Sequence, residues 1–171
     1  MLSLLMRRPH LKDLPPVPDG VDPAGPLDAT ALAHLLDAAF STTWTPDRVR
    51  LELLDDPTVR ATYLIRRGDR LVATASARVL PHRDPQAGWL HWVASHPALR
   101  GRGLGLAVTV AALHRFAADG LTSSALETDD HRLPAISAYL RLGFVPQYPT
   151  QTHQDRWSEI FRRLSLRRHA R

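Results

Sequence analysis

The chain has 171 residues, of which 44% are hydrophobic and 23% are charged. These proportions are typical of a soluble globular protein, and the length suits one domain with a full core. There is no cysteine, which excludes disulfides, thiolate metal sites and a cysteine nucleophile and fits the cytosol. No metal site is expected. The net charge of +5 favours polyanions as partners without selecting among them.

The N-terminal part of the sequence predicts neither export nor a membrane anchor. The apolar stretch of residues 1–6 ends at Arg7 and Arg8, so it is too short for the hydrophobic region of a signal peptide or for a membrane span. Residues 1–26 are rich in proline and glycine and have no hydrophobic period. We therefore expect an extended, partly disordered leader over residues 1–26.

Two helices are predicted next. Leucines recur at helical spacing from Leu27 to Phe40, with Asp28 or Thr30 as the cap. The second helix follows Thr45 and Pro46, an N-cap and first-turn pair, and runs to about residue 54. Trp44 lies between the two helices. A role as a packing anchor is favoured for it over a role as a substrate contact.

Three strands are expected between residues 61 and 95. The segments 61–66 and 71–80 alternate in polarity across a short turn that contains Gly68, a pattern that indicates a hairpin. Residues 89–95 are nearly all apolar, as in a central strand covered on both faces. His91 is the one ionisable group in that strand, and a core histidine is the favoured interpretation over a functional one.

The strand at 89–95 is followed by a glycine-rich turn, residues 100–105, and a largely apolar helix over residues 103–118 that ends at Gly120. Three glycines let the backbone N–H groups approach a ligand where the helix dipole is positive, so this turn predicts a phosphate-binding loop. A Walker loop would need lysine and a hydroxyl residue after Gly105, and Leu106 and Ala107 stand there. A dinucleotide fold would place its glycine motif early in the chain.

The C-terminal third predicts a strand at 121–128, a helix from Pro134 to Gly143, a short strand within 145–152 and a terminal helix. The terminal helix is indicated by helical spacing in one apolar set, Trp157, Ile160, Phe161 and Leu164. The basic residues at 166–171 form a tail for which solvation is favoured over contact with nucleic acid or an acidic partner.

Two motifs resemble the GCN5-related N-acetyltransferase (GNAT) superfamily. Arg100, Gly103 and Gly105 match its Arg/Gln-x-x-Gly-x-Gly/Ala signature, in which the loop holds the pyrophosphate of acetyl-CoA. The second motif, residues 126–144, resembles the closing strand and helix of the family; its matching positions are Glu127, Ala135, Tyr139, Gly143 and Phe144. The resemblance covers about residues 27–144, and we expect the domain to span 27–165.

The resemblance implies a fold and a reaction. The fold class would be α/β (α+β), with a mixed, mostly antiparallel twisted sheet flanked by helices and a terminal helix where the family usually has a β-hairpin. The reaction would be direct transfer of an acetyl group from acetyl-CoA to a primary amine in a ternary complex. The acceptor would be a small molecule or a peptide, with neither nucleic acid nor membrane as partner.

The resemblance also implies roles for individual residues. Glu127 matches the general base of some members, with His91 as the alternative, and Tyr139 matches the acid that protonates the CoA thiolate. Three kinds of cofactor contact are implied: the strand backbone, the glycine-rich turn, and the cofactor-arm position, where Arg132 replaces a common asparagine. The residues are Val93, Ala94, Ser95, Arg100, Gly101, Arg102, Gly103, Leu104, Gly105, Leu106 and Arg132. Ser95 stands where valine is usual.

Two other functions stay open at this point. One is a catalytically idle acetyltransferase-like domain that senses acyl-CoA, and the other is a nucleic-acid-binding protein that uses the basic C-terminus. The sequence leaves open the acceptor, the preferred acyl chain and the oligomeric state, including a homodimer.

Overall fold

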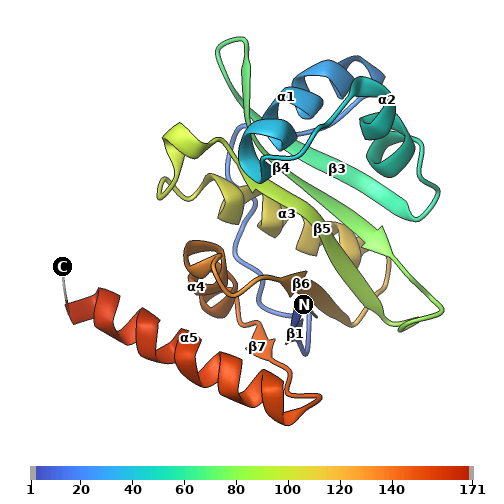
Figure 1. Ribbon diagram of the computed structural model, residues 1–171. Coiled ribbons are helices and arrows are strands. Elements are labelled where there is room, and N and C mark those ends of the chain that lie inside the picture. The colour runs from blue at the N-terminus through green and yellow to red at the C-terminus, as the bar shows by residue number, and fades with distance from the viewer. Residues whose placement is uncertain (1–2, 170–171) are drawn as a thin grey trace. The chain divides into compact units, whose positions relative to one another are not determined.

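The computed structural model describes residues 3–169 (Figure 1). The chain folds as two compact units, described here in turn. The larger unit comprises His10–Ser124, and the smaller unit joins the N-terminal segment up to Pro9 to the chain from Ala125 onward. The domain boundaries expected at residues 27 and 165 stay a prediction.

The larger unit is built on four antiparallel strands in the order β2-β3-β4-β5. They are β2 (Val21–Pro23), β3 (Val59–Arg67), β4 (Arg70–Val79) and β5 (Ala87–Ser95). The predicted hairpin is confirmed: Arg67 pairs with Arg70, and Gly68 between them has φ +57°, which a glycine adopts without steric cost.

One face of this sheet is covered by the two predicted helices. Helix α1 (Ala29–Phe40) follows the short 3-10 turn η1 (Pro26–Asp28), and α2 (Pro46–Val49) runs directly into the π-helical turn η2 (Arg50–Leu54). The predicted cap is present, because the Thr45 hydroxyl accepts the backbone N–H of Arg48 at 3.2 Å. Leu64, Leu71 and Trp44 join the buried side chains of α1 in one apolar cluster.

The opposite face is covered by α3 (Leu104–Ala118) (Figure 1). Ile65 and Val72 pack with Leu104 and Val108 of this helix. Each lies next in sequence to a residue that packs on α1, as expected when successive strand side chains alternate between faces. The near absence of polar residues on α3 therefore reflects its buried position.

The smaller unit contains three strands in the order β6-β1-β7, with β1 (Leu4–Arg8) antiparallel to β7 (Val145–Pro146). Strand β6 (Ser123–Thr128) begins at the last two residues of the larger unit. The expectation of a partly disordered leader is wrong at β1 and β2, because both are paired strands. Both strands were missed because each is short and its residues do not alternate between apolar and polar.

Strand β1 also supplies a side chain that caps the C-terminal end of helix α4. Helix α4 (Leu133–Arg141) ends just before Gly143, which has φ +80°. The buried side chain of Arg8 donates from Nη1 to the carbonyl oxygen of Leu142 at 2.5 Å. A cation is favourable there, because the carbonyl end of a helix carries partial negative charge.

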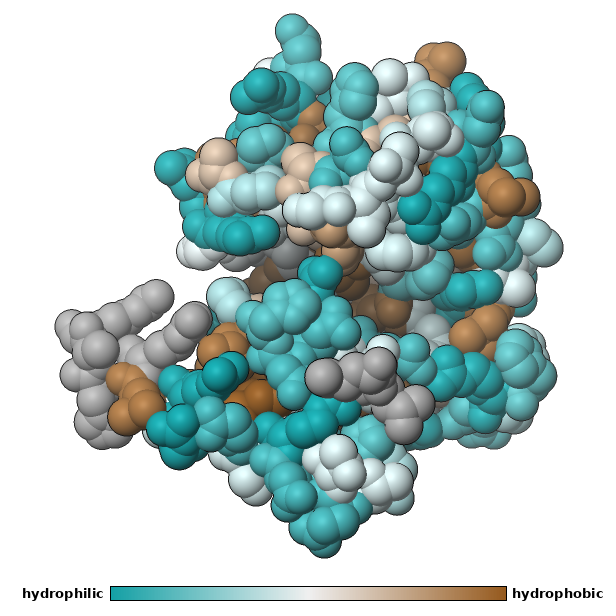
Figure 2. Space-filling model, viewed as in Figure 1, coloured by the Kyte–Doolittle hydropathy of each residue, from teal (hydrophilic) through white to brown (hydrophobic). Residues whose placement is uncertain are grey.

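The predicted terminal helix is confirmed as α5 (Gln151–His169). Trp157 and Ile160 are buried, and Arg156 holds both carboxylate oxygens of Asp130 in the loop after β6. The expected tail at 166–171 continues this helix as far as residue 169, and residues 170–171 lie outside the described part. The outer surface of α5 is mostly hydrophilic, with apolar spots (Figure 2).

The observed elements confirm the predicted fold class. Helices lie on both faces of the antiparallel strands of the larger unit, and a helix of 19 residues closes the chain.

Candidate active site

The turn between β5 and α3 has the geometry of a loop with an exposed backbone. It begins with the 3-10 turn η3 (Pro97–Leu99). Gly101 and Gly103 follow in the left-handed region, with φ +81° and +75°, where a side chain would be strained. A Cβ atom on either glycine or on Gly105 would meet no other atom within 4 Å. The three glycines therefore leave open space beside the main chain.

This open space lies at the start of a long helix. Gly103 is the N-cap of α3 and supplies no side-chain cap, and the first turn has no acidic residue. The N–H groups of a first helical turn have no partner within the helix and carry partial positive charge. Arg100 and Arg102 are exposed on the approach to this turn. The arrangement fits an anion with several acceptor oxygens, such as a diphosphate.

Strand β5 is interrupted before it reaches the turn. His91 pairs with Ser76 and Ala94 pairs with Thr74, so β5 has one more residue in this interval than β4 and forms a β-bulge. Trp92 in the bulge has φ +48°, which costs about 1 to 3 kcal/mol for a residue other than glycine.

The bulge adjoins the predicted backbone contacts. Val93 and Ser95 are partly exposed and Ala94 is buried. Ala94 and Ser95 pair with β4, whereas Trp92 and Val93 together lie opposite a single residue of β4. A bulge of this kind releases backbone groups from the ladder, so β5 can offer N–H groups to a ligand there.

His91 lies largely buried beside the bulge, with its ring centroid 5.6 Å from that of Trp92. Burial, and to a smaller extent the nearby Arg78, lower the pKa of His91 to about 4, while Glu52 and Asp56 oppose the change. The imidazole is therefore neutral at pH 7, and it can accept a hydrogen bond or a proton without a charge of its own.

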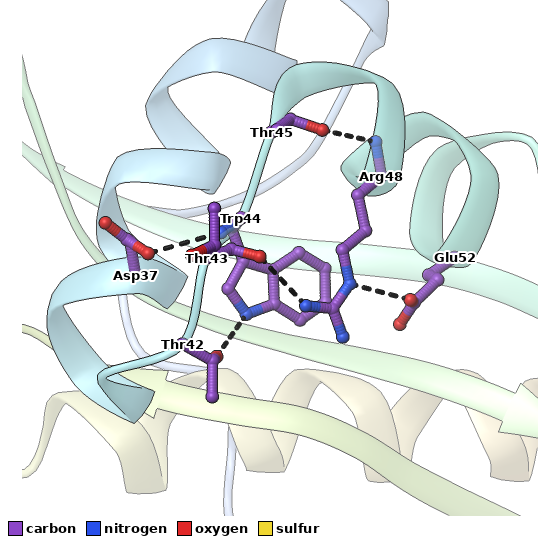
Figure 3. A network of polar contacts seen from close by, with 7 residues as sticks. All are labelled: Asp37, Thr42, Thr43, Trp44, Thr45, Arg48 and Glu52. Atoms are coloured by element: carbon purple, nitrogen blue, oxygen red, sulfur yellow. Dashed lines mark hydrogen bonds and ion pairs between the residues drawn. The ribbon is translucent and has the colours of Figure 1, made fainter.

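A polar network fixes the segment between α1 and α2 (Figure 3). The Trp44 indole N–H donates to Thr42, and the Arg48 side chain donates to Glu52 at 2.8 Å and to the Thr43 carbonyl at 3.0 Å. The Arg48 guanidinium lies 3.9 Å from the ring centroid of Trp44, a cation–π contact. Trp44 is only 6% exposed, in agreement with its interpretation as a packing anchor.

The remaining predicted side chains belong to the smaller unit. Glu127, near the end of β6, is exposed. Arg132 is the N-cap residue of α4 and pairs with Asp129 at 3.3 Å. Asp130 has its pKa lowered mainly by the hydrogen bonds from Arg156. The acidic group after β6 is thus partly committed to arginine partners.

Tyr139 lies on the buried side of α4 and packs edge-on against Phe144, with ring centroids 5.9 Å apart. Burial raises the pKa of Tyr139 to about 12, with Arg132 opposing the change. Among the residues that the structure describes, its hydroxyl has no hydrogen-bond partner. Tyr139 is therefore a neutral phenol with a free donor.

The profile of the acetyltransferase (GNAT) family matches residues 29–144. The match covers more than half of the chain and includes both motifs on which the resemblance was based. This chain belongs to the GNAT family. The family uses acyl-CoA as donor, in agreement with the anion-binding geometry at the start of α3.

Individual relatives agree with the family assignment. A mycothiol acetyltransferase of Nocardia farcinica is 34% identical over 154 residues, which cover 82% of this chain and 50% of the relative. One of Thermomonospora curvata is 33% identical over 83% of this chain and 51% of its own length. The chain thus spans about half the length of these curated relatives.

Solved structures show the same fold. A GNAT-family acetyltransferase of Colwellia psychrerythraea superposes with a TM-score of 0.70 at 19% identity, over 85% of this chain and 53% of that protein. At this identity the likeness supports the GNAT fold alone.

Sequence reasoning missed two features of the GNAT chain. The bulge at Trp92 has no local signal, because a bulge in the left-handed region is usually marked by glycine. The contact of Arg48 with Trp44 was also missed, although an arginine two residues after a helix-starting proline could have drawn attention to it.

Within residues 3–169, no group of acidic, histidine or cysteine residues could hold a metal ion, and no described helix is long and apolar enough to cross a membrane.

Proposed function

We propose that this protein transfers an acetyl group from acetyl-CoA to a primary amine by direct attack in a ternary complex. One observation carries the proposal: the open, glycine-lined start of α3, with no acidic side chain in its first turn and two exposed arginines before it. Gly101, Gly103 and Gly105 give a diphosphate access to the main-chain N–H groups of this turn. Leu104 and Leu106 contribute N–H groups of the first helical turn.

The thioester would be held by β5. The backbone N–H groups of Val93, Ala94 and Ser95 would bind the pantetheine arm and stabilise the negative charge that develops on the thioester oxygen. Fixed donors of this kind are effective because they need no reorganisation during the reaction. Arg132 is proposed to contact the cofactor arm.

Glu127 is the first choice for the base. A primary ammonium has a pKa near 10.4, so either candidate base removes its proton against a gradient. A carboxylate attracts the ammonium before it accepts a proton, directly or through water. The neutral His91 imidazole, with a pKa of about 4, offers no such attraction. His91 is the alternative base.

Tyr139 is proposed to protonate the departing thiolate. Its pKa of about 12 exceeds the ordinary pKa of a thiol by about 3.5 units, a gradient of roughly 5 kcal/mol. Burial that raises the pKa of a phenol also raises that of a thiol in the same surroundings. The transfer is therefore favourable only where water is excluded from the thiolate as well.

The acceptor is proposed to be a small amine. The relatives with 33% and 34% identity are named mycothiol acetyltransferases, so mycothiol lacking its acetyl group is the first compound to test. A panel of amino acids, polyamines, aminoglycosides and peptide N-termini would complete the survey.

The absence of cysteine removes any protein background from a thiol assay, so a thiol reagent detects released CoA with every acceptor that carries no thiol. For mycothiol lacking its acetyl group, which is itself a thiol, chromatography would separate the released CoA from the acceptor. We expect acetyl-CoA to bind in titration calorimetry and CoA release to depend on the acceptor. Binding without release across the panel would favour the acyl-CoA sensor. No heat with acetyl-CoA or longer acyl-CoA would contradict the proposal.

A further inference from the structure

The partly buried side chain of Trp92 packs against three side chains from α1, α2 and the segment between them. The ring of Trp44 meets it edge-to-face at 4.7 Å and 87°, and the ring of Phe40 does so at 5.1 Å and 78°. The Arg48 guanidinium lies 5.8 Å from the Trp92 centroid and covers Trp44 more closely. Aromatic pairs prefer this edge-to-face geometry. Phe40, Trp44 and Arg48 therefore form a well-defined packing site for the Trp92 side chain.

Hydrogen bonds hold two residues of this packing site, Trp44 and Arg48. The backbone N–H of Trp44 donates to Asp37 of α1 at 3.2 Å, and its indole N–H donates to Thr42. Arg48 is held by Glu52 and by the Thr43 carbonyl (Figure 3). Each covering side chain therefore has hydrogen-bond partners of its own besides its contact with Trp92.

The backbone of Trp92, whose side chain occupies this packing site, is strained. Trp92 is one of three residues other than glycine with positive φ in the described chain; the other two, Asp13 and Ser41, are small and polar. A bulky residue stays in the left-handed region only where its surroundings hold it there. The packing of Phe40, Trp44 and Arg48 is what the structure offers to hold it.

We propose that the segment Trp44–Arg48 acts as a clamp on Trp92 that sets the bulge in β5, and thereby aims the backbone N–H groups that follow it. This inference rests on the proposed function, in which N–H groups of Val93 to Ser95 serve the thioester. Trp44 and Arg48 are then positioning residues: they act through Trp92 and do not touch the substrate.

The first test compares two arginines of the same helical segment. Arg48 and Arg50 each form one ion pair with a nearby carboxylate, with Glu52 and Asp47, but only Arg48 covers the tryptophans. Arg48→Ala should lower kcat about 10-fold, because misaligned donors stabilise the transition state less well, with a smaller change in KM. Arg50→Ala should leave both constants unchanged. Equal effects of the two variants would overturn the clamp.

A second test reads the bulge without any substrate. In the folded protein, the backbone chemical shifts of Trp92 should be those of a left-handed residue. Trp44→Ala should move them toward extended values, and Trp44→Phe, which keeps an aromatic edge, should largely restore them. Trp89→Ala is the control. Trp89 lies in the same strand as Trp92 and is about as buried as Trp44, but it is covered by Arg83. Unchanged Trp92 shifts in folded Trp44→Ala would contradict the inference.

The two proposals fail in different ways. If the wild-type protein does not bind acetyl-CoA, the proposed function fails, while the chemical shifts still decide whether the clamp sets the bulge. If acetyl-CoA binds and turns over but Arg48→Ala matches the wild type in kcat, the clamp is wrong and the proposed function stands.

Discussion

Burial changes the proton affinity of two candidate catalytic side chains, one in each unit. Removing a group from water disfavours its charged form. It lowers the pKa of His91 to about 4 and raises that of Tyr139 to about 12. Both groups are therefore neutral over the whole physiological range, and any proton that either one moves must be moved during the reaction.

The buried imidazole makes stability depend on pH. The pKa of His91 in the folded state lies below its value of about 6.5 in the unfolded chain, so the unfolded state takes up the proton first and stability falls as pH drops. The loss should begin near pH 6.5, be complete near pH 4, and reach about 3 kcal/mol at most.

Urea unfolding of the wild type and of His91→Gln at pH 7.5 and pH 4.5 would measure this effect. The carboxylates contribute equally to both proteins, so the difference between them isolates His91. We expect the variant to lose clearly less stability on acidification than the wild type. Parallel losses would show that the imidazole is accessible to protons in the folded state.

Removing the hydroxyl of Tyr139 should affect turnover and leave the stability of the fold unchanged. Because that hydroxyl has no hydrogen-bond partner among the described residues, Tyr139→Phe should leave the urea midpoint nearly unchanged. It should also leave the Kd for acetyl-CoA unchanged and lower kcat by about 100-fold, the effect of losing a general acid. Loss of binding would instead mark Tyr139 as a structural residue.

At the scale of elements, β5 passes very close to α3. A Cβ on Gly88 would lie 2.2 Å from the ring of Phe116, whereas a Cβ on Gly105 would meet nothing. Gly88→Ala should therefore destabilise the protein by about 3 kcal/mol or more through overpacking. Gly105→Ala should stabilise it by up to about 1 kcal/mol through helix propensity.

Thermal unfolding of the two variants checks this contrast, since both make the same chemical change, one near the start of β5 and the other at the start of α3. Gly105 is also a cleaner probe of the anion site than Gly103, where positive φ would add strain to any loss of binding. Gly105→Val should weaken acetyl-CoA binding with little change in the melting temperature. Little loss of stability in Gly88→Ala would contradict this expectation and show that β5 and α3 move apart to accommodate the methyl group.

Elements with strong local signals could be predicted from the sequence. The hairpin around Gly68, the helix that ends at Gly120 and the Thr45 cap all follow from short-range patterns, and each is present. Strand β1 could not be predicted, because its neighbours β6 and β7 lie far along the chain and only two residue pairs join it to β7. The glycine-rich turn was recognisable, but the bulge at Trp92 depends on side chains from α1 and the loop after it.

At the scale of the whole molecule, positive charge should govern encounter with the donor. The net charge is +5, and Arg100 and Arg102 are both exposed beside the turn. Acetyl-CoA carries several negative charges, and attraction between exposed charges is screened beyond about 10 Å at 0.1 M salt. Binding of acetyl-CoA should therefore weaken as sodium chloride is raised.

Neutralising the two arginines should reduce that dependence. In calorimetric titrations from 0.02 to 0.5 M sodium chloride, the double variant with Arg100→Gln and Arg102→Gln should bind more weakly at low salt. It should then approach the wild type at high salt, because screening removes the contribution that the arginines make. Arg60 of β3 and Arg141 of α4 are exposed like the two arginines of the turn, so the double variant with Arg60→Gln and Arg141→Gln removes the same charge elsewhere in the chain and should preserve the wild-type slope. Equal slopes for the two double variants would mean that the net charge, and not the turn, attracts the coenzyme.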